Sequence, residues 1–188
     1  MKETDQRVLK TRRQLKEAFI MLVISNGFAG TTIRDITKRA GVGYRTFFRH
    51  YKDANELWQD IMGEFIDEVG MLFDPPGDAA TAEANLITLF RETGRRADFF
   101  RAMFRAPDWE ARFKPLIDFG RKSGKRSFPQ NELPEDVVIT HFVFSVLTLQ
   151  KWWLDQNMQP EPEVMAQYAN RLVIQPLRAL AEKPLPEG

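Results

Sequence analysis

Residues 27–57 constrain the fold of this chain more than any other segment, and they read GFAGTTIRDITKRAGVGYRTFFRHYKDANEL. Thr32 and Asp35 have the spacing of a capping box, which predicts the start of a helix. The apolar residues that follow at helical spacing are Ile33, Ile36 and Ala40. Gly41 comes directly after them, where a residue in the left-handed conformation ends a helix at little cost. The segment therefore predicts a short helix closed by a tight glycine turn.

A second helix is expected from Gly43 or Tyr44 to about Tyr51. At about 100° per residue, its aromatic side chains fall on one side of the helix and its polar side chains on the other. The aromatic side comprises Phe47, Tyr51, Tyr44 and Phe48, with Tyr44 and Phe48 at a border between the two sides. The polar side comprises Arg45, Arg49, Thr46 and His50. We expect the aromatic side to pack into the domain and the polar side to meet a partner.

Helices are also predicted on both sides of this pair. An upstream amphipathic helix ends at Asn26-Gly27, and Asp53 and Glu56 form a second capping box that opens a long helix. The middle two helices then form a helix-turn-helix, and two arginines one turn apart suit a helix that lies in the major groove of DNA. The alternative is a small helical bundle with a charged, solvated face. The glycine turn, the two caps and the polar side together count against that alternative.

Several short motifs in this region carry a resemblance to a known family. In order, they are GF, TT, an Ile, AGV, TFFRHY and EL. Over about residues 10 to 60 the chain resembles the N-terminal domain of the TetR family of transcriptional regulators. The resemblance implies a homodimer with two helix-turn-helix units and a ligand-controlled C-terminal domain. The rest of the chain is similar to the family only in size and helical character.

The expected DNA contacts combine the two lines of reasoning. By position, the residues that match DNA-touching places in relatives are Arg34, Tyr44, Arg45, Thr46, Phe48 and His50. Arg45 and Arg49 are expected to read base edges, since an arginine binds guanine through two hydrogen bonds, with smaller contacts from Thr46 and Tyr44. The residues expected to hold phosphates are Arg34, Thr32, His50 and Lys52.

Three positions depart from the family pattern. The usual helix-starting Ser is Gly43, the usual Tyr of a Leu-Tyr pair is Phe48, and the usual Lys near the start of the fourth helix is Ala54. Lys52 is the nearest substitute for that Lys. Phe48 cannot donate a hydrogen bond to a phosphate, and our hypothesis is that the Tyr44 hydroxyl makes this bond instead.

Composition and charge fit a DNA-binding protein outside the membrane. The chain has 188 residues, 43% of them hydrophobic, and no cysteine, which excludes disulfides and thiol chemistry. Its start lacks a hydrophobic signal segment, and its most apolar run, residues 142–149, is too short to span a bilayer, so we expect a cytoplasmic protein with no membrane partner. Residues 1–60 carry a net charge of +5, where the helix-turn-helix lies, and residues 95–126 carry +6.

The rest of the chain reads as helices, and the predicted fold is all-α with about nine helices. Asp74-Pro75-Pro76-Gly77-Asp78 is the clearest break in the helical pattern. We expect a three-helix DNA-binding domain over residues 1–54 and a helical effector-binding and dimerisation domain over residues 55–188. The tail, residues 183–188, is expected to be loose.

Residues 137–154 predict a helix that is apolar almost all the way round, and such a helix must be covered on every side. One side can meet the core and the other a second subunit, in a four-helix interface with the helix expected at about 163–180. The alternative is a central core helix of a monomer. The residues expected at the dimer interface are Phe144, Leu147, Trp153, Tyr168 and Leu172.

The many aromatic residues of the C-terminal part suggest a pocket for an apolar or amphipathic effector of unknown identity. The residues expected to line it are Phe65, Phe100, Met103, Phe104, Phe113, Ile117, Phe142 and Trp152, although any one of them is equally suited to the core. The second basic block either guides an anionic effector or forms a solvated face. Its ten members are Arg95, Arg96, Arg101, Arg105, Arg112, Lys114, Arg121, Lys122, Lys125 and Arg126.

The sequence holds no pattern of a catalytic, metal or cofactor site. His50 and His141 have no partner at metal-ligand spacing, and no phosphate loop or serine elbow occurs. We therefore expect a dimeric regulator that leaves a palindromic duplex when its effector binds, most simply a repressor. The alternatives are an activator, a DNA-binding protein without an effector, and a helical enzyme or small-molecule-binding protein.

Overall fold

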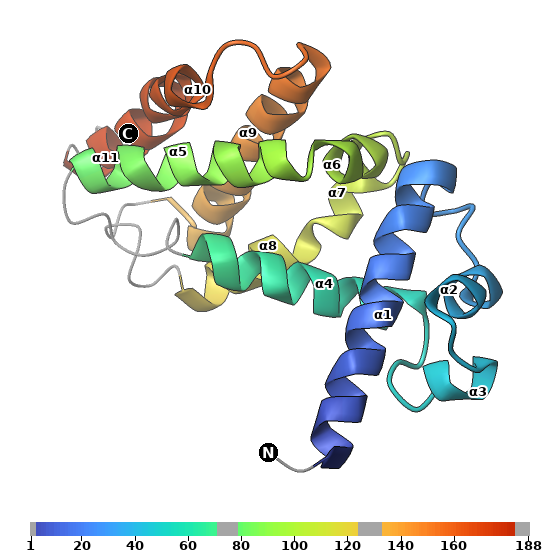
Figure 1. Ribbon diagram of the computed structural model, residues 1–188. Coiled ribbons are helices and arrows are strands. Elements are labelled where there is room, and N and C mark those ends of the chain that lie inside the picture. Colours follow the sequence, from blue (N-terminus) through green and yellow to red (C-terminus); the bar gives the residue numbers. More distant parts are fainter. Residues whose placement is uncertain (1–2, 71–78, 124–132, 183–188) are drawn as a thin grey trace. The chain divides into compact units, whose positions relative to one another are not determined.

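The computed structural model describes residues 3–70, 79–123 and 133–182, and within them it contains helices and no strand (Figure 1). The helices that begin the chain are α1 (Glu3–Asn26), α2 (Ile33–Ala40), α3 (Tyr44–Phe47) and α4 (Ala54–Val69). They are followed by α5 (Ala79–Arg95), α6 (Ala97–Phe104), α7 (Trp109–Arg112) and α8 (Lys114–Ser123). The last part contains α9 (Glu135–Asp155), α10 (Pro162–Ala169), the π-helical η3 (Asn170–Ile174) and α11 (Gln175–Glu182). The predicted all-α fold is confirmed.

The chain divides into two compact units that differ from the expected domains. The first unit comprises residues 1–64 and 98–109, and the second comprises residues 65–97 and 110–188. The division falls inside α4 rather than at residue 54, because the first half of α4 contacts the first unit: Trp58 packs on Phe28 with ring centroids 6.2 Å apart, and Asp60 accepts hydrogen bonds from Arg12 and Tyr51. Residues 98–109 join the first unit because Phe99 of α6 packs on Trp58 of α4, with ring centroids 5.7 Å apart. The expected break at 74–78 and the tail at 183–188 lie outside the described residues.

The first unit is built around α1. Leu15, Phe19 and Val23 of α1 are fully buried, as are Ile36 of α2 and Phe47 of α3. α2 packs on α1, and α3 packs on α2. The stripe of apolar residues predicted for α1 and α2 thus becomes the core against which α3 is set.

Caps end these helices where the sequence predicts. Gly27 after α1 and Gly41 after α2 are both left-handed, with φ of 72° and 67°. The amide of Gly41 donates to the carbonyl of Lys38 at 3.3 Å, and the amide of Val42 to that of Thr37 at 3.1 Å. At the start of α4, the amide of Glu56 donates to the Asp53 carboxylate at 2.8 Å.

The second unit packs α9 against α5 and the α10–η3 segment. Trp153 of α9 meets Phe90 of α5 edge to face, with centroids 5.5 Å apart. Gln150 of α9 donates a buried hydrogen bond of 2.6 Å to the Thr93 hydroxyl of α5. Among the described helices, α9 is the one long and apolar enough to cross a membrane, but half of its most apolar window is buried in this unit, as a core helix requires.

Two glycines of the first unit should respond to the same substitution in opposite directions. Gly41→Ala should lower the free energy of unfolding by about 1–2 kcal/mol, because alanine is strained in the left-handed conformation. Gly63→Ala should raise it by about 0.5–1 kcal/mol, because Gly63 lies inside α4 with no atom near its missing side chain. Urea unfolding followed by circular dichroism measures both. A shift of the two variants in the same direction would contradict the assigned turn.

Candidate nucleic-acid interface

The α2–α3 turn presents one side of α3 and buries the other. Phe47 is fully buried and Tyr51 is 2% exposed, so the aromatic side anchors α3 in the first unit. Tyr44 and Phe48, predicted at the border, are 49% and 47% exposed. Their rings meet edge to face with centroids 5.2 Å apart. Because the anchor is on one side of so short a helix, Arg45 and Arg49 are left exposed on the other side.

The second helix of the pair is shorter than predicted. α3 ends at Phe47 rather than near Tyr51, and residues 48–50 form a turn. The amides of Arg49 and His50 donate to the carbonyls of Thr46 and Phe47, at 3.2 and 2.9 Å, which are three residues back instead of four. The last turn is therefore tightened into 3₁₀-type geometry.

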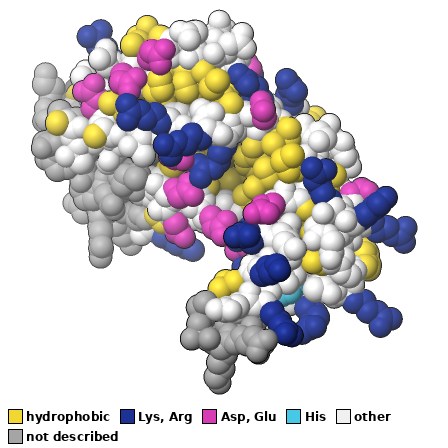
Figure 2. Space-filling model, viewed as in Figure 1, with side chains coloured by type: hydrophobic (Ala, Val, Ile, Leu, Met, Phe, Trp, Pro, Cys, Tyr) yellow, Lys and Arg dark blue, Asp and Glu magenta, His cyan; other side chains and the backbone are white. Residues whose placement is uncertain are grey.

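The residues expected to contact DNA are accessible. Those exposed are Thr32, Arg34, Tyr44, Arg45, Phe48, Arg49 and Lys52, and those half-buried are Thr46 and His50. They come from the start of α2, from α3 and from the turn that follows α3. Dark blue Lys and Arg side chains gather over this part of the first unit (Figure 2).

Thr32 caps α2 in a way that differs from the predicted box. Its hydroxyl accepts the amide hydrogen of Asp35 at 3.2 Å, as expected. The Asp35 carboxylate, however, accepts a hydrogen bond from that same hydroxyl rather than reaching back to a backbone amide. The Thr32 hydroxyl is thus already occupied twice, and it must exchange its bond to Asp35 to donate to a phosphate.

The cations of this surface are unpaired. Within the described part of the chain, the following residues form no ion pair: Arg34, Lys38, Arg39, Arg45, Arg49 and Lys52. Lys38 and Arg39 were not among the residues expected to contact DNA, although the sequence places both in the last turn of α2. Because no carboxylate of the described residues is within ion-pair distance of them, these side chains leave a positive surface, which attracts a polyanion.

The second basic block has the opposite character. At least five of its members form ion pairs with acidic neighbours: Arg95, Arg96, Arg101, Lys114 and Arg121. Lys125 and Arg126 lie outside the described residues. This neutralisation favours the solvated face over the site for an anionic effector.

His50 is tuned toward its neutral form. Its pKa is lowered from the ordinary value, first by partial burial and then by the positive charges of Arg49 and Arg12. A neutral imidazole at pH 7 still has one N–H to donate to a phosphate.

The residues expected in one effector pocket are divided between the two units. Phe100, Met103 and Phe104 are buried in the first unit, whereas Phe65, Phe113, Ile117 and Phe142 are buried in the second. Trp152 is 46% exposed, so it does not belong to the same core as Phe142. The pattern of apolar residues did not distinguish the two cores, because both contain phenylalanines at helical spacing.

The expected dimer interface also needs a correction. Leu147 and Trp153 are only 3% and 2% exposed, because both lie in the core of their own unit. The Trp153 indole packs on Phe90 and donates a hydrogen bond of 2.6 Å to the Pro160 carbonyl, so it is not available to a partner. Phe144 is half-buried, and Tyr168 and Leu172 are 43% and 64% exposed.

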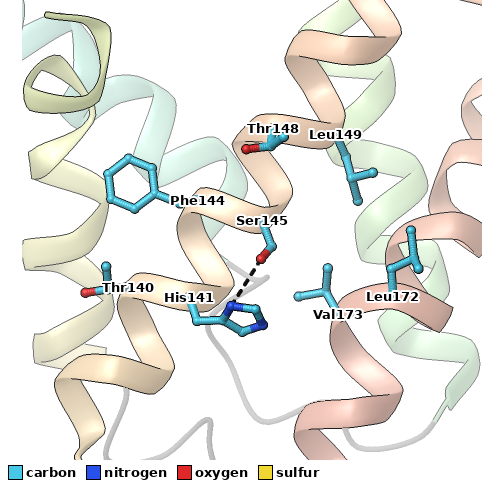
Figure 3. Close-up of a pocket in the computed structure, with 8 residues that line it drawn as sticks. All are labelled: Thr140, His141, Phe144, Ser145, Thr148, Leu149, Leu172 and Val173. Atoms are coloured by element: carbon cyan, nitrogen blue, oxygen red, sulfur yellow. Dashed lines mark hydrogen bonds between the residues drawn. The ribbon is translucent and has the colours of Figure 1, made fainter.

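An open groove of about 430 Å³ lies along α9 and η3 (Figure 3). Its lining comprises Thr140, His141, Phe144, Ser145, Thr148, Leu149, Leu172 and Val173. The groove thus includes two of the residues expected at the dimer interface and none of those expected in the effector pocket. Among the described residues, no group of acidic or histidine side chains is placed to hold a metal ion.

Comparison with known proteins agrees with this geometry. Residues 17–61 match the family described as bacterial regulatory proteins, tetR family. An uncharacterized HTH-type transcriptional regulator of Bacillus subtilis (strain 168), YxbF, is 35% identical over 79 residues, which are 39% of this chain. The chain spans about a fifth of the length of that curated relative.

Solved structures share the fold over nearly the whole chain. A TetR transcriptional regulator from Streptococcus agalactiae 2603V is 23% identical, with a TM-score of 0.62 over 90% of this chain and 97% of that one. Thermus thermophilus FadR, a repressor solved with lauroyl-CoA, is 19% identical, with a TM-score of 0.58 over 94% of this chain and 100% of that one. These relatives are regulators rather than enzymes, in agreement with the expectation for this chain.

The matched segment covers α2, α3, both glycine turns and the unpaired cations described above. The helix-turn-helix segment of this chain is therefore similar to the tetR family of bacterial regulatory proteins.

Proposed function

We propose that this chain is a dimeric, cytoplasmic, DNA-binding transcriptional regulator that releases a palindromic duplex when a small effector binds, and acts as a repressor. The observation that carries the proposal is the contrast in charge pairing. The cations of α2 and of the α3 turn have no acidic partner in the described structure, whereas half of the second basic block is paired. Phosphates supply the missing partners, and binding them releases counterions from DNA.

Arg45 and Arg49 read base edges in the major groove. Both are exposed, and the buried ring of Phe47 between them in sequence fixes the side of α3 on which they emerge. The guanidinium fork matches the two acceptors of guanine, which makes arginine the commonest specific reader of that base. Arg34, His50 and Lys52 hold the phosphates on either side, and the same role falls to Thr32 once it releases Asp35.

Arg45→Ala and Arg49→Ala should each weaken binding to the duplex that the protein selects from a random pool by about 1–3 kcal/mol. A scrambled duplex should lose much less, because base contacts distinguish sequences and phosphate contacts do not. Fluorescence anisotropy with both duplexes measures the two affinities. The absence of any selected motif, even at low salt, would refute DNA recognition.

Two further substitutions separate base reading from general charge. Arg105→Ala removes an exposed arginine outside the helix-turn-helix that forms no ion pair with the residues that the structure describes, and it should leave both affinities unchanged. Lys52→Gln should lower the affinity for both duplexes by the same factor. It should also reduce the slope of log affinity against log salt concentration by about one.

The Tyr44 hydroxyl replaces the phosphate donor that Phe48 lacks. The two rings lie side by side at the exposed border of α3, and within the described structure the Tyr44 hydroxyl has no hydrogen-bond partner. Tyr44→Phe should therefore weaken binding to the selected duplex by about 0.5–1.5 kcal/mol without changing the stability of the free protein.

The reciprocal variant provides the control. Adding Phe48→Tyr to the Tyr44→Phe protein moves the hydroxyl to the neighbouring ring and should restore most of the lost affinity. Unchanged affinity in the single variant, measured by the same titration, would show that the hydroxyl makes no contact.

A second copy of the chain covers the α9–η3 face. Phe144 and Leu172 leave apolar surface on this face, and the groove between α9 and η3 adds Leu149 and Val173. Tyr168 of the adjoining α10 is also exposed. In Figure 3, Leu149, Leu172 and Val173 lie together at one flank, and Phe144 lies at the other. A two-fold axis through this face places the apolar side chains of each copy against the groove of the other copy. The two helix-turn-helix units of such a dimer then match a palindrome.

Leu172→Arg should convert the dimer to a monomer, because it places two charges near the two-fold axis of an apolar contact. Analytical ultracentrifugation measures the change. Leu9→Arg is the matched control, since Leu9 is 56% exposed on α1 and lies outside the proposed interface. A Leu172→Arg protein that sediments like the unaltered chain would exclude this face.

The effector binds in the second unit, where an apolar or amphipathic molecule can displace aromatic core contacts. Phe65, Phe113, Ile117 and Phe142 are the expected lining residues that belong to this unit. Thermus thermophilus FadR, which has the same fold, was solved with lauroyl-CoA, an amphipathic molecule. A screen of such compounds for release of the selected duplex tests this part of the proposal.

Effector and DNA are linked through α4. Asp60 ties its first half into the first unit through Arg12 and Tyr51. In the second unit, Arg96 pairs with Glu68 and lies over the Phe65 ring at 6.0 Å. A helix held at both ends transmits a displacement from one unit to the other, so the two ligands oppose each other by linkage.

A further inference from the structure

Asp60, in the second turn of α4, lies at the centre of a cluster that joins three parts of the first unit. Its carboxylate accepts hydrogen bonds from the Tyr51 hydroxyl at 2.6 Å and from Arg12 Nη2 at 2.8 Å, and Lys16 Nζ lies 2.7 Å away. Arg12 also donates to the Tyr51 hydroxyl at 3.2 Å and lies over the Tyr51 ring at 5.5 Å. Arg12, Lys16, Tyr51 and Asp60 are called the Asp60 cluster below.

The cluster is sheltered enough for these bonds to matter. The side chain of Lys16 is 12% exposed and that of Asp60 is 23% exposed. Burial alone would raise the pKa of Asp60, but hydrogen bonds from Lys16, Tyr51 and Arg12 outweigh it and lower that pKa. Burial and the bond to Asp60 raise the pKa of Tyr51, so the phenol keeps its proton and donates it. Charge-assisted bonds of this kind are stronger and shorter than neutral ones.

Tyr51 is the residue through which the cluster reaches the DNA surface. It directly follows Arg49 and His50, and its amide donates to the Phe47 carbonyl at 2.9 Å. α3 itself has a single turn of α-helix, and its N-cap Gly43 makes no side-chain capping bond. So short a helix cannot fix its own direction, and its exit is held from outside by the ring and hydroxyl of Tyr51.

We infer that Asp60 is a positioning residue of the DNA-reading surface, which sets the direction of Arg45 and Arg49 by holding the exit of α3 against α1 and α4. The inference rests on the proposed DNA-binding function and adds a residue that touches no DNA. A binding constellation loses precision when the residues behind it move by about 0.5 Å or more. The loss should therefore fall on sequence discrimination rather than on attraction to DNA in general.

Asp60→Asn tests the inference, because asparagine keeps the shape of the side chain and removes its charge. Its affinity for the selected duplex should fall on the order of tenfold, while its affinity for a scrambled duplex of the same length stays level or rises. A purely electrostatic effect has the opposite sign for the selected duplex, since removing a negative charge strengthens attraction to DNA. An equal change for both duplexes would overturn the inference.

Tyr51→Phe removes only the hydroxyl and provides a second, milder variant. It should lower the same affinity ratio by less, and the double variant should lose about as much as Asp60→Asn alone, because the only bond that Tyr51→Phe removes from Asp60 is one that Asp60→Asn already weakens. Glu64→Gln is the matched control. Glu64 lies one turn further along α4 and pairs with Lys16 at 2.6 Å, but it does not contact Tyr51, so its ratio should be unchanged.

Hydrogen exchange provides a readout that needs no DNA. In Asp60→Asn and Tyr51→Phe, the amides of Arg49, His50 and Tyr51 should exchange faster, while those of α2 keep their protection. If the unaltered chain selects no DNA sequence, the proposed function is refuted. Hydrogen exchange still tests whether Asp60 and Tyr51 hold the end of α3. Unchanged protection at residues 49–51 in both variants would overturn the inference.

Discussion

The burial of Phe47 is the constraint on which the proposed interface depends. α3 contains four residues, so one buried ring decides its orientation about its own axis. Phe47 is turned into the core, and Tyr51 is buried after the following turn. The side chains of Arg45 and Arg49 are therefore exposed to solvent. α1 and α2 provide the apolar surface on which Phe47 packs. Gly41, in the left-handed conformation, turns the chain so that α3 lies on that surface.

Charge pairing distinguishes two basic regions, residues 1–60 and 95–126, at α2 and the α3 turn: the cations there have no ion pair in the described structure, although Arg12, Arg13 and Lys16 of α1 do. Both carry a similar net positive charge, and a count of residues does not distinguish a binding surface from a solvated one. Carboxylates on the same or neighbouring helices lie within ion-pair distance of Arg95, Arg96, Lys114 and Arg121. Around α3 the nearest acidic side chains are used for capping instead, as with Asp35 and Asp53. Because these acidic side chains cap helices, the arginines remain available to bind another molecule.

The helix-turn-helix could be predicted closely because its signals are local. Caps, a glycine stop and a one-turn spacing of arginines depend on residues within a few positions of one another. The length of α3 was overestimated, and Asp35 does not complete the predicted capping box. The second unit was harder, because α9 is apolar on nearly every side and periodicity cannot say which side meets which neighbour. Trp153 and Leu147 turned inward and Trp152 outward. Trp153 is held by Phe90 of α5, which is far away in sequence, and by a hydrogen bond to the Pro160 carbonyl in the following loop. The Asp60 cluster was missed for the same reason, since its members lie up to 48 residues apart.

The two grips on α4 differ in strength, and this difference gives a direction to the proposed switch. In the first unit, the Asp60 carboxylate is 23% exposed and receives three charged or polar partners, so breaking the cluster leaves a partly buried carboxylate with fewer partners, although Arg12 itself is 41% exposed. In the second unit, Arg96 and Glu68 are 36% and 46% exposed, and an ion pair of that kind contributes about 0–1 kcal/mol. The weaker grip lies in the unit proposed to bind the effector, so an effector can displace that end of α4 at small cost. A typical coupling of about 1–3 kcal/mol between two ligands lies above the strength of this weaker grip. The Asp60 cluster, which resists rearrangement, then carries the displacement to α3 rather than absorbing it.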